Sequence, residues 1–235
     1  MAHVTTTPIV ALDVASADAA MRVVESLGER CRFYKIGSEL FTAAGPGIVT
    51  RVRDAGCDVF LDLKLYDIPN TVLGAARSAA SLGVRLLTVH ATGGVRMIEA
   101  AVEGGGEATS ILAVTVLTSF DDASLREATG RADVTARDEV ARLAELAVRA
   151  RAHGIVCSGA EAANLRSRFG ERLAILVPGI RMAGSAANDQ RRVVTPAGAA
   201  AAGARYIVVG RAVTAAPDPR AAMDQVLGEL TSVAV

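Results

Sequence analysis

The sequence predicts an α/β protein that folds as a single-domain (β/α)8 barrel of the TIM type. Eight short apolar segments alternate with segments of helical character from one end of the chain to the other. The length of 235 residues is ordinary for one such barrel, and no linker or shift in composition marks a domain boundary. An open doubly wound sheet is the competing layout, but eight regular units without a linker favour closure. We therefore expect one domain over residues 1–235.

The expected strands are short runs rich in β-branched and other apolar residues, bounded by turn residues. They lie at residues 8–14, 32–37, from 59 through Asp62 and Lys64, 85–90, 110–117, 154–157, 173–177 and 205–209. The segments that follow them have helical patterns, and Pro69 suits the first turn of a helix. We expect helices at residues 17–27, 69–82, 95–102, 138–152, 160–168 and 219–230. Further helical segments are expected between the second strand and about residue 55.

The composition argues against a protein that binds nucleic acid or a membrane. The chain has 25 acidic and 25 basic residues, so no net field attracts a polyanion. Aromatic residues make up 3% and Trp is absent, which removes the stacking platforms used by proteins that bind single strands. No apolar run reaches the roughly 18 residues of a membrane span, and the N-terminus lacks the regions of a signal peptide. We therefore expect a soluble, cytoplasmic protein.

Cys31, Cys57 and Cys157 are few and far apart in the sequence. Their spacing fits neither a disulfide framework nor a zinc site. We interpret them as reduced thiols in the core, as in cytoplasmic proteins. No metal site is predicted.

The stretch from residue 59 to residue 72 places charged side chains at the end of an expected strand. Asp62 and Lys64 are two positions apart, and because side chains alternate along a strand, we expect both on one face. Asp67 follows where the strand should have ended. A structural ion-pair network would explain a lone Asp-x-Lys, since buried charges need partners. The third charge and the helix start at Pro69 favour a ligand site, because this fold binds ligands at the C-terminal ends of its strands.

Polar residues also lie late in the other expected strands or at their ends. We expect them to face the same mouth of the barrel: Asp13, Lys35, His90, Thr118 and Ser119. His90 can either contact a ligand or support a residue that does. Asp121 or Asp122 can cap the helix after the fifth strand.

Glycines and arginines follow the seventh and eighth strands, where this fold commonly binds phosphate. Pro178 and Arg181 precede a polar loop that continues through Gln190, and Gly210-Arg211 leads into a helix. Backbone N–H groups and guanidinium groups bind a phosphate through charge-assisted hydrogen bonds. Most arginines form surface ion pairs, but the placement of Arg181 and Arg211 after these two strands indicates a phosphate site. The long loop at residues 181–194 suggests a lid over a phosphorylated ligand.

Several motifs in one order resemble the orotidine 5′-monophosphate decarboxylase family, bacterial type. DLKLYDIPNT, at residues 62–71, is similar to the family signature Asp-x-Lys-x-x-Asp-Ile-Pro-x-Thr. The resemblance runs along nearly the whole chain, because further motifs match in order. These are ALD ending at Asp13, KIG from Lys35, TVHATGG from Thr88, LTS around Thr118, PGIR ending at Arg181, NDQ ending at Gln190 and VVGR ending at Arg211.

The resemblance implies a role for each matched residue. Lys64 is implied as the proton donor in a charged array with Asp62, Asp67 and Lys35. Asp67 and Thr71 are implied to enter the site of the neighbouring subunit in a homodimer. The resemblance implies ribose contacts for Asp13, Lys35 and Thr71, pyrimidine contacts for Thr118 and Ser119, and phosphate contacts for Arg181, Gln190, Gly210 and Arg211. The full expected substrate-binding set is Asp13, Lys35, Asp62, Leu63, Lys64, Leu65, Tyr66, Asp67, Ile68, Pro69, Asn70, Thr71, Thr118, Ser119, Pro178, Arg181, Gln190, Gly210 and Arg211.

The activity implied by this resemblance is decarboxylation of orotidine 5′-monophosphate to uridine 5′-monophosphate and CO2, the last step of de novo pyrimidine biosynthesis. Loss of CO2 leaves electron density on C6 of the ring, and the Lys64 ammonium is suited to stabilise and then protonate it. No metal or organic cofactor is expected. Two departures are visible: Tyr66 stands where close relatives often carry His, and Val177 where Thr usually precedes Pro-Gly-Ile-Arg.

Two other functions compete with this interpretation. Sugar-phosphate enzymes such as 3-keto-gulonate-6-phosphate decarboxylase and hexulose-phosphate synthase share Asp-x-Lys-x-x-Asp but use Mg²⁺. They carry a metal-binding Glu where this chain has Lys35, and a lysine cation there repels Mg²⁺. A nucleotide-binding module without activity is the non-enzymatic alternative. The presence of every implied catalytic residue argues against that alternative.

Overall fold

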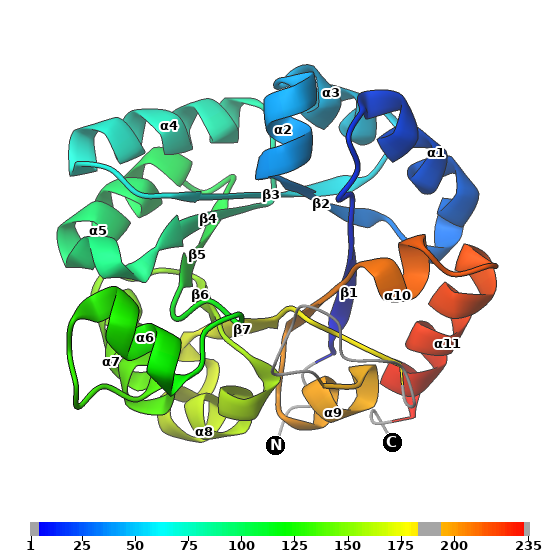
Figure 1. Ribbon diagram of the computed structural model, residues 1–235. Helices are drawn as coiled ribbons and strands as arrows, with labels where there is room; N and C mark the ends of the chain where they lie inside the picture. The colour runs from blue at the N-terminus through cyan, green and yellow to red at the C-terminus, as the bar shows by residue number, and fades with distance from the viewer. Residues whose placement is uncertain (1–4, 183–193, 233–235) are drawn as a thin grey trace.

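The computed structural model describes residues 5–182 and 194–232. Within these ranges, eight parallel strands pair in chain order and β8 pairs with β1, so the sheet closes into a barrel (Figure 1). The strands are β1 (Thr7–Ala11), β2 (Phe33–Gly37), β3 (Asp58–Leu65), β4 (Leu86–His90), β5 (Ser110–Val114), β6 (Gly154–Val156), β7 (Ala174–Val177) and β8 (Tyr206–Val209). The predicted (β/α)8 barrel is confirmed.

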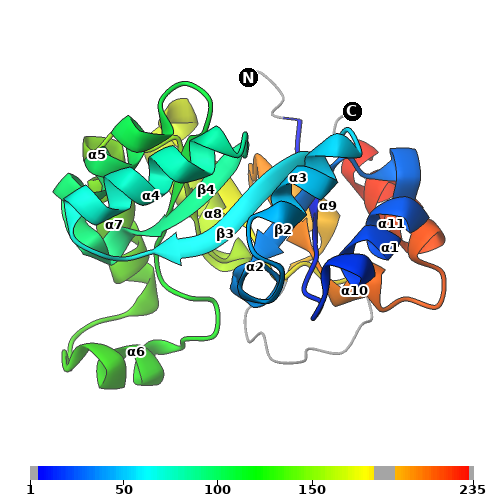
Figure 2. The same cartoon turned by 90° about the horizontal axis from the view of Figure 1, so that it is seen from above.

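The helices lie outside the strands and surround the barrel (Figure 1). They are α1 (Ala17–Leu27), α2 (Ser38–Ala44), α3 (Gly47–Asp54), α4 (Pro69–Ser81), α5 (Gly94–Gly105), α6 (Asp122–Thr129), α7 (Ala136–Arg149), α8 (Gly159–Phe169), α9 (Pro196–Ala201), α10 (Arg211–Thr214) and α11 (Pro219–Thr231). Figure 2 shows α6 standing away from the ring of helices, at the end of the barrel where α2 and α10 also lie. No helix in the described ranges is long and apolar enough to cross a membrane.

The hydrophobic core has two layers, because alternate strand residues point into the barrel or out toward the helices. The inner layer fills the barrel with Ile9, Ala11, Phe33, Phe60, Leu86, Leu112, Leu176, Tyr206 and Val208. The outer layer joins the strands to the apolar faces of the helices. Cys31, Cys57 and Cys157 are all buried, as expected, and no disulfide joins them.

Two strands end three residues earlier than the sequence predicted. The first was expected to reach residue 14 and the fifth residue 117, but β1 ends at Ala11 and β5 at Val114. The apolar pattern continues beyond both ends because Leu12 and Val116 are still buried. An apolar pattern indicates which residues are buried and not which residues pair in a sheet. The pattern therefore predicted ends for these two strands that lie beyond their paired residues. Thr118 and Ser119 therefore lie in the loop after β5, not at the strand end.

The segment after β5 contains two helices. The predicted helix at residues 138–152 is α7, which begins and ends a few residues earlier. Before it, Asp121 caps α6 by accepting a hydrogen bond from the Ser124 N–H, as the sequence suggested. Asp122 instead accepts a hydrogen bond from the Ala136 N–H at 2.8 Å and so holds the start of α7.

Helices α4 and α5 pack closely against each other next to β3 and β4 (Figure 1). At Gly104 of α5, a Cβ atom would lie 2.4 Å from the carbonyl oxygen of Leu73 and 2.9 Å from the Cβ of Ala76, both on α4. Glycine is required at this crossing because any side chain would push the two backbones apart.

Candidate active site

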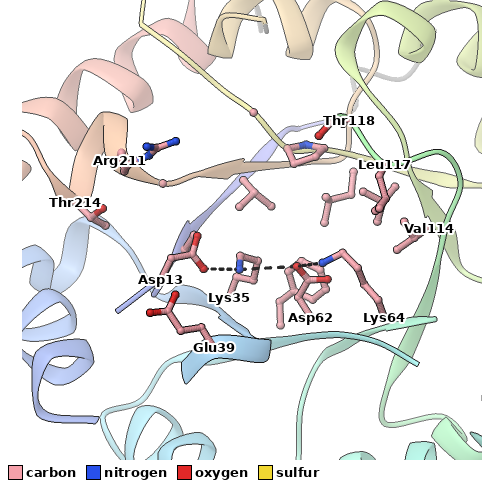
Figure 3. Close-up of a pocket in the computed structure, with 18 of the residues that line it drawn as sticks. Asp13, Lys35, Glu39, Asp62, Lys64, Val114, Leu117, Thr118, Arg211 and Thr214 are labelled. Atoms are coloured by element: carbon pink, nitrogen blue, oxygen red, sulfur yellow. Dashed lines mark hydrogen bonds and ion pairs between the residues drawn. The ribbon is translucent and has the colours of Figure 1, made fainter. Parts of the chain in front are cut away.

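Four side chains of alternating charge form a row across the ends of β1, β2 and β3 (Figure 3). Lys35 Nζ donates a hydrogen bond to Asp13 Oδ1 at 2.8 Å and lies 3.8 Å from Asp62 Oδ2. Lys64 Nζ donates to the same Asp62 oxygen at 2.9 Å. Two carboxylates thus alternate with two ammonium groups, so each charge has an opposite charge beside it.

The row lies in a cavity of about 470 Å³ at the C-terminal ends of the strands. The inner core residues Ala11, Phe60, Leu176 and Val208 form part of its wall. The side chain of Lys35 is 11% exposed and that of Asp62 is 14% exposed, whereas that of Lys64 is 35% exposed. Lys64 is therefore the member of the Asp62–Lys64 pair that is most open to a molecule in the cavity.

The two ends of the row differ in character, as Figure 3 shows. Arg211 and Thr214 lie beyond Asp13 at one end. Val114 and Leu117 lie toward Lys64 at the other end. The cavity can therefore hold an elongated ligand with an anionic group near Arg211 and an apolar or planar group near Lys64.

The backbone at Lys64 is left-handed rather than extended. Its φ is 50°, a region that costs a residue with a side chain about 1–2 kcal/mol. The prediction that Asp62 and Lys64 lie on one side is confirmed by the 2.9 Å bond between them. Its stated reason, regular alternation along a strand, is wrong, because β3 is irregular between Leu61 and Leu65. The bulge turns the Lys64 side chain toward Asp62.

Lys35 and Lys64 are the two lysines of the chain, which carries its other positive side chains as arginine. An arginine guanidinium stays protonated under all ordinary conditions, whereas an ammonium group can give up a proton. Both lysines stand in the same row of charges. Both lysine side chains of the chain therefore lie in the cavity, where each offers a compact ammonium group that can donate a proton to a ligand.

Gly37, the last residue of β2, makes room for this row. A Cβ atom at this position would lie 2.8 Å from Lys35 Nζ and 3.4 Å from Asp13 Oδ1. Gly37 belongs to the KIG motif, and nothing in the sequence alone indicates why a glycine stands there. Glu39 and Thr214 also line the cavity and were missed, because neither lies at a strand end or in a motif that we matched.

His90 lies at the end of β4 and is not among the residues that line the cavity. Its ring meets that of Tyr66 edge to face, with centroids 5.8 Å apart. Burial and, to a lesser degree, the nearby Lys64 ammonium hold the pKa of His90 below its ordinary value. Of the two roles left open for His90, the structure favours that of a supporting residue beside Lys64.

The run from Tyr66 to Thr71 does not join the cavity of its own chain. Asp67 is exposed, and its Oδ1 accepts a hydrogen bond from the N–H of Ile68 at 2.7 Å. The charges at residues 62, 64 and 67 of the sequence predict a cluster, but none of the described contacts joins Asp67 to Asp62 or Lys64 within one chain. Tyr66 is 64% exposed and Ile68 67%. Pro69 begins α4 as expected, with Asn70 and Thr71 exposed on its first turn.

The remaining predicted contacts divide into those in the cavity and those outside it. Thr118, Pro178, Arg181, Gly210 and Arg211 line the cavity. Leu63 and Leu65 pack against the outer core, and Ser119 is exposed. Gln190, and with it the predicted lid, lies outside the described residues. The two ends of that segment meet, because the Arg181 N–H donates to the Val194 carbonyl oxygen at 3.1 Å.

The described residues include no group of three or more His, Cys, Asp or Glu side chains arranged to hold a metal ion. At the centre of the cavity, the acids Asp13 and Asp62 have the Lys35 ammonium between them. The arrangement can bind an anionic ligand, place an ammonium against it and donate a proton to it.

Comparisons with known proteins agree with this geometry. The family model described as "Orotidine 5'-phosphate decarboxylase / HUMPS family" matches residues 6–226. A relative from Halorhodospira halophila, named orotidine 5'-phosphate decarboxylase, is 50% identical over 227 residues, which are 95% of each chain. A protein of the same name from Cutibacterium acnes is 50% identical over 220 residues, 92% of this chain and 93% of the relative. The crystal structure of orotidine 5'-phosphate decarboxylase from Lactobacillus acidophilus superposes with a TM-score of 0.85 at 36% identity, over 96% of this chain and 99% of that one.

Proposed function

The chain belongs to the orotidine 5′-phosphate decarboxylase / HUMPS family, and from this membership we propose that it converts orotidine 5′-monophosphate to uridine 5′-monophosphate and CO2. This reaction would be the cytoplasmic last step of de novo pyrimidine biosynthesis. The observation that carries the proposal is the row Asp13, Lys35, Asp62 and Lys64 in the cavity. A chain with this row and with relatives of that name at 50% identity fits an orotidine 5′-phosphate decarboxylase better than a binding module.

The shape of the cavity supports one orientation of the nucleotide. The phosphate would lie near Arg181, Gly210 and Arg211, where guanidinium and backbone N–H groups can bind its oxygens. The ribose would lie over Asp13 and Lys35. The pyrimidine would then reach Lys64, with Thr118 on the other side of the cavity (Figure 3). The phosphate contacts are far from the reacting carbon, so they can supply binding energy that is used in the chemical step.

Lys64 is proposed as the catalytic acid. When the bond between C6 and the carboxyl carbon breaks, CO2 leaves and the electron pair stays on C6. The Lys64 ammonium stabilises this charge and transfers a proton to C6, and water later restores the proton on the lysine. Asp62 holds Lys64 Nζ at 2.9 Å before the substrate arrives, so the ammonium is already oriented. We assign the main effect to this preorganised electrostatic field, to which Lys35 also belongs.

We propose that the active molecule is a homodimer in which each subunit lends Asp67 and Thr71 to the other. In one chain Asp67 lies outside its own cavity, so its carboxylate is available to another site. The same run exposes Tyr66 and Ile68, the exposed large hydrophobic residues of the described chain. Tyr66 and Ile68 lie two residues apart on this exposed run, and apolar patches left exposed by one chain often mark an interface between proteins.

The HUMPS part of the family name allows a second candidate, a Mg²⁺-dependent enzyme that acts on a sugar phosphate. Lys35 argues against it, because its ammonium lies between Asp13 and Asp62, where a divalent cation would be repelled. Activity on orotidine 5′-monophosphate should therefore survive dialysis against EDTA. Loss of activity that Mg²⁺ restores would favour the sugar-phosphate enzyme.

The proposed function is tested by turnover of orotidine 5′-monophosphate and by two substitutions of Lys64. Lys64→Ala removes the proton donor, and Lys64→Arg keeps the charge on a group that does not release its proton. Both variants should lose turnover by about 10²-fold or more, the usual contribution of a positioned acid. Both should still bind uridine 5′-monophosphate, which carries no charge at C6.

Arg22→Ala, on the exposed side of α1, is the control and should turn over substrate like the unchanged protein. Absence of turnover by the unchanged protein would refute the proposed function. Full activity of Lys64→Arg would refute the role of Lys64 as the acid.

A further inference from the structure

Strands β3 and β4 pair regularly except opposite one residue. Leu61 pairs with Leu87, and Leu65 pairs with Val89. Three residues of β3, Asp62 to Lys64, therefore face the single residue Thr88 of β4. A bulge of this kind interrupts the ladder of backbone hydrogen bonds, so its polar groups need other partners.

The side chain of Thr88 supplies those partners. Its hydroxyl oxygen accepts a hydrogen bond from the Lys64 N–H at 2.9 Å, and its O–H donates to Asp62 Oδ1 at 2.9 Å. A threonine hydroxyl has one donor and two acceptor positions, so the donor is fully used by the carboxylate. Thr88 is 0% exposed, which means that water cannot take over either bond.

These two bonds act on the two residues that carry the proposed chemistry. With Oδ1 held by Thr88, the other oxygen of Asp62 is left to face Lys64 Nζ at 2.9 Å and Lys35 Nζ at 3.8 Å. The bond to the Lys64 N–H holds that residue in its left-handed conformation, with φ 50°. A change at Thr88 would therefore move both ends of the Asp62–Lys64 pair.

We propose that Thr88 is a positioning residue of the active site, which aims the Lys64 ammonium by fixing the Asp62 carboxylate and the Lys64 backbone. This inference rests on the proposed function for its effect on turnover, but its structural part does not. Thr88 is not among the residues that line the cavity. It acts through Asp62 and Lys64.

Other buried threonines of the described chain behave differently. The hydroxyl of Thr109 donates to the Val84 carbonyl oxygen at 2.7 Å, and that of Thr115 to the Val156 carbonyl oxygen at 2.7 Å. Both connect backbone segments, whereas Thr88 donates to an ionised side chain of the site. Thr109 is 1% exposed and lies just before β5, away from the cavity, so it is a matched control for the loss of a buried hydroxyl.

The first measurement compares Thr88→Val, Thr88→Ser and Thr109→Val. Thr88→Val keeps the shape and removes both hydrogen bonds, and we expect kcat to fall by about 10- to 100-fold, the range for one lost hydrogen bond to a charged group. The affinity for uridine 5′-monophosphate should change by less than about threefold, because the phosphate and ribose contacts remain. Thr88→Ser keeps the hydroxyl and should retain kcat within about threefold. Thr109→Val should retain kcat although it loses a buried hydrogen bond.

The second measurement needs no turnover. Because the chain has two lysines, a protein whose lysines carry ¹³C at Cε alone gives two side-chain signals, and Lys64→Arg identifies the one from Lys64. Thr88→Val should shift the Lys64 signal, and Thr109→Val should leave it in place. If Thr88→Val does not fold, Thr88→Ala removes the same hydroxyl without a methyl group against the carboxylate and should give the same results.

The outcomes separate the two proposals. An unchanged protein that is inactive on orotidine 5′-monophosphate would refute the proposed function, while the lysine signals would still test the role of Thr88. An active protein whose Thr88→Val variant keeps its kcat and its Lys64 signal would overturn the role of Thr88. A kcat loss in Thr109→Val equal to that in Thr88→Val would overturn it as well, because the effect would then be general to buried threonines.

Discussion

At the scale of single residues, the row of charges depends on a residue without a side chain. Gly37 precedes α2 and lies beside Lys35 Nζ. A Cβ atom at residue 37 would occupy the space next to this ammonium group. The ammonium is the end of a flexible side chain, so it can move elsewhere in the cavity. A side chain at residue 37 should therefore reduce activity more than it reduces the stability of the fold.

We predict that Gly37→Ala lowers kcat for orotidine 5′-monophosphate by about tenfold or more and changes the free energy of unfolding by less than about 1 kcal/mol. A Cβ at residue 37 would lie 2.8 Å from Lys35 Nζ and so displace it from Asp13 and Asp62. Steady-state kinetics and urea unfolding measure the two effects. Gly47→Ala is the control, because a Cβ there meets nothing within 4 Å. Unchanged kinetics in Gly37→Ala would contradict the prediction.

His90 gives a prediction for pH. Burial, and then the Lys64 ammonium, lower the pKa of His90 in the folded protein, so the unfolded chain, with a pKa of about 6.5, binds a proton more readily. The contribution of neutral His90 to stability is thus present above pH of about 6.5 and is lost as the pH falls toward the lowered folded pKa. Urea unfolding between pH 5 and pH 8 should show this loss in the unchanged protein and a smaller one in His90→Gln. Identical pH dependence of the two proteins would show that His90 does not contribute.

At the scale of elements, β3 and the helix after it illustrate two ways in which local irregularity serves the site. The bulge between Leu61 and Leu65 turns Lys64 into the cavity, and the following loop leaves Asp67 outside it. Helix α4 then returns along β3 and packs closely on α5. Pro69, Asn70 and Thr71 belong to the first turn of α4, so the packing of α4 on α5 fixes where that turn lies.

We predict that Gly104→Ala destabilises the protein by about 1–3 kcal/mol, the cost of overpacking at a tight contact. The added Cβ would lie 2.4 Å from the Leu73 carbonyl oxygen, which is backbone and cannot move away as a flexible side chain can. Gly228→Ala is a matched control in α11, where a Cβ meets nothing within 4 Å, and it should stabilise the helix by about 0.5–1 kcal/mol. Urea unfolding of both variants measures the difference. Equal effects of the two substitutions would mean that α4 and α5 can separate at little cost.

At the scale of the whole molecule, the barrel forms an incomplete site if Asp67 takes part in it. The row of charges comes from β1, β2 and β3 of one chain, whereas Asp67 of that chain lies outside the cavity. A two-fold interface is isologous, so each subunit would lend its own Asp67 and receive the other one.

Mixed dimers test this exchange. Lys64→Ala and Asp67→Ala homodimers should each be nearly inactive. After dissociation, mixing and reassociation, about half of the dimers should be hybrids, and in each hybrid one site carries both defects and the other carries neither. About a quarter of all sites should then be intact, and activity should return to about that level. A mixture that stays inactive, with hybrids confirmed by native mass spectrometry, would show that Asp67 serves its own subunit.

The sequence by itself determined the fold and predicted most of the polar residues that line the candidate site. Alternating apolar and helical segments predicted the eight-stranded barrel, because each strand must be buried on both faces and each helix on one. The expected position of ligands at the C-terminal strand ends then brought Asp13, Lys35, Asp62, Lys64 and Arg211 to one cavity, as the structure shows. These features follow from local patterns and from the topology of the fold.

The tertiary structure alone decided how those residues meet. The left-handed backbone of Lys64 and the two hydrogen bonds of Thr88 depend on the register between β3 and β4, which no pattern within either strand contains. The need for glycine at Gly37 likewise arises from the position of Lys35 Nζ and Asp13 Oδ1. Distances between groups on different strands are set by packing across the barrel, and a linear sequence shows the groups without showing those distances.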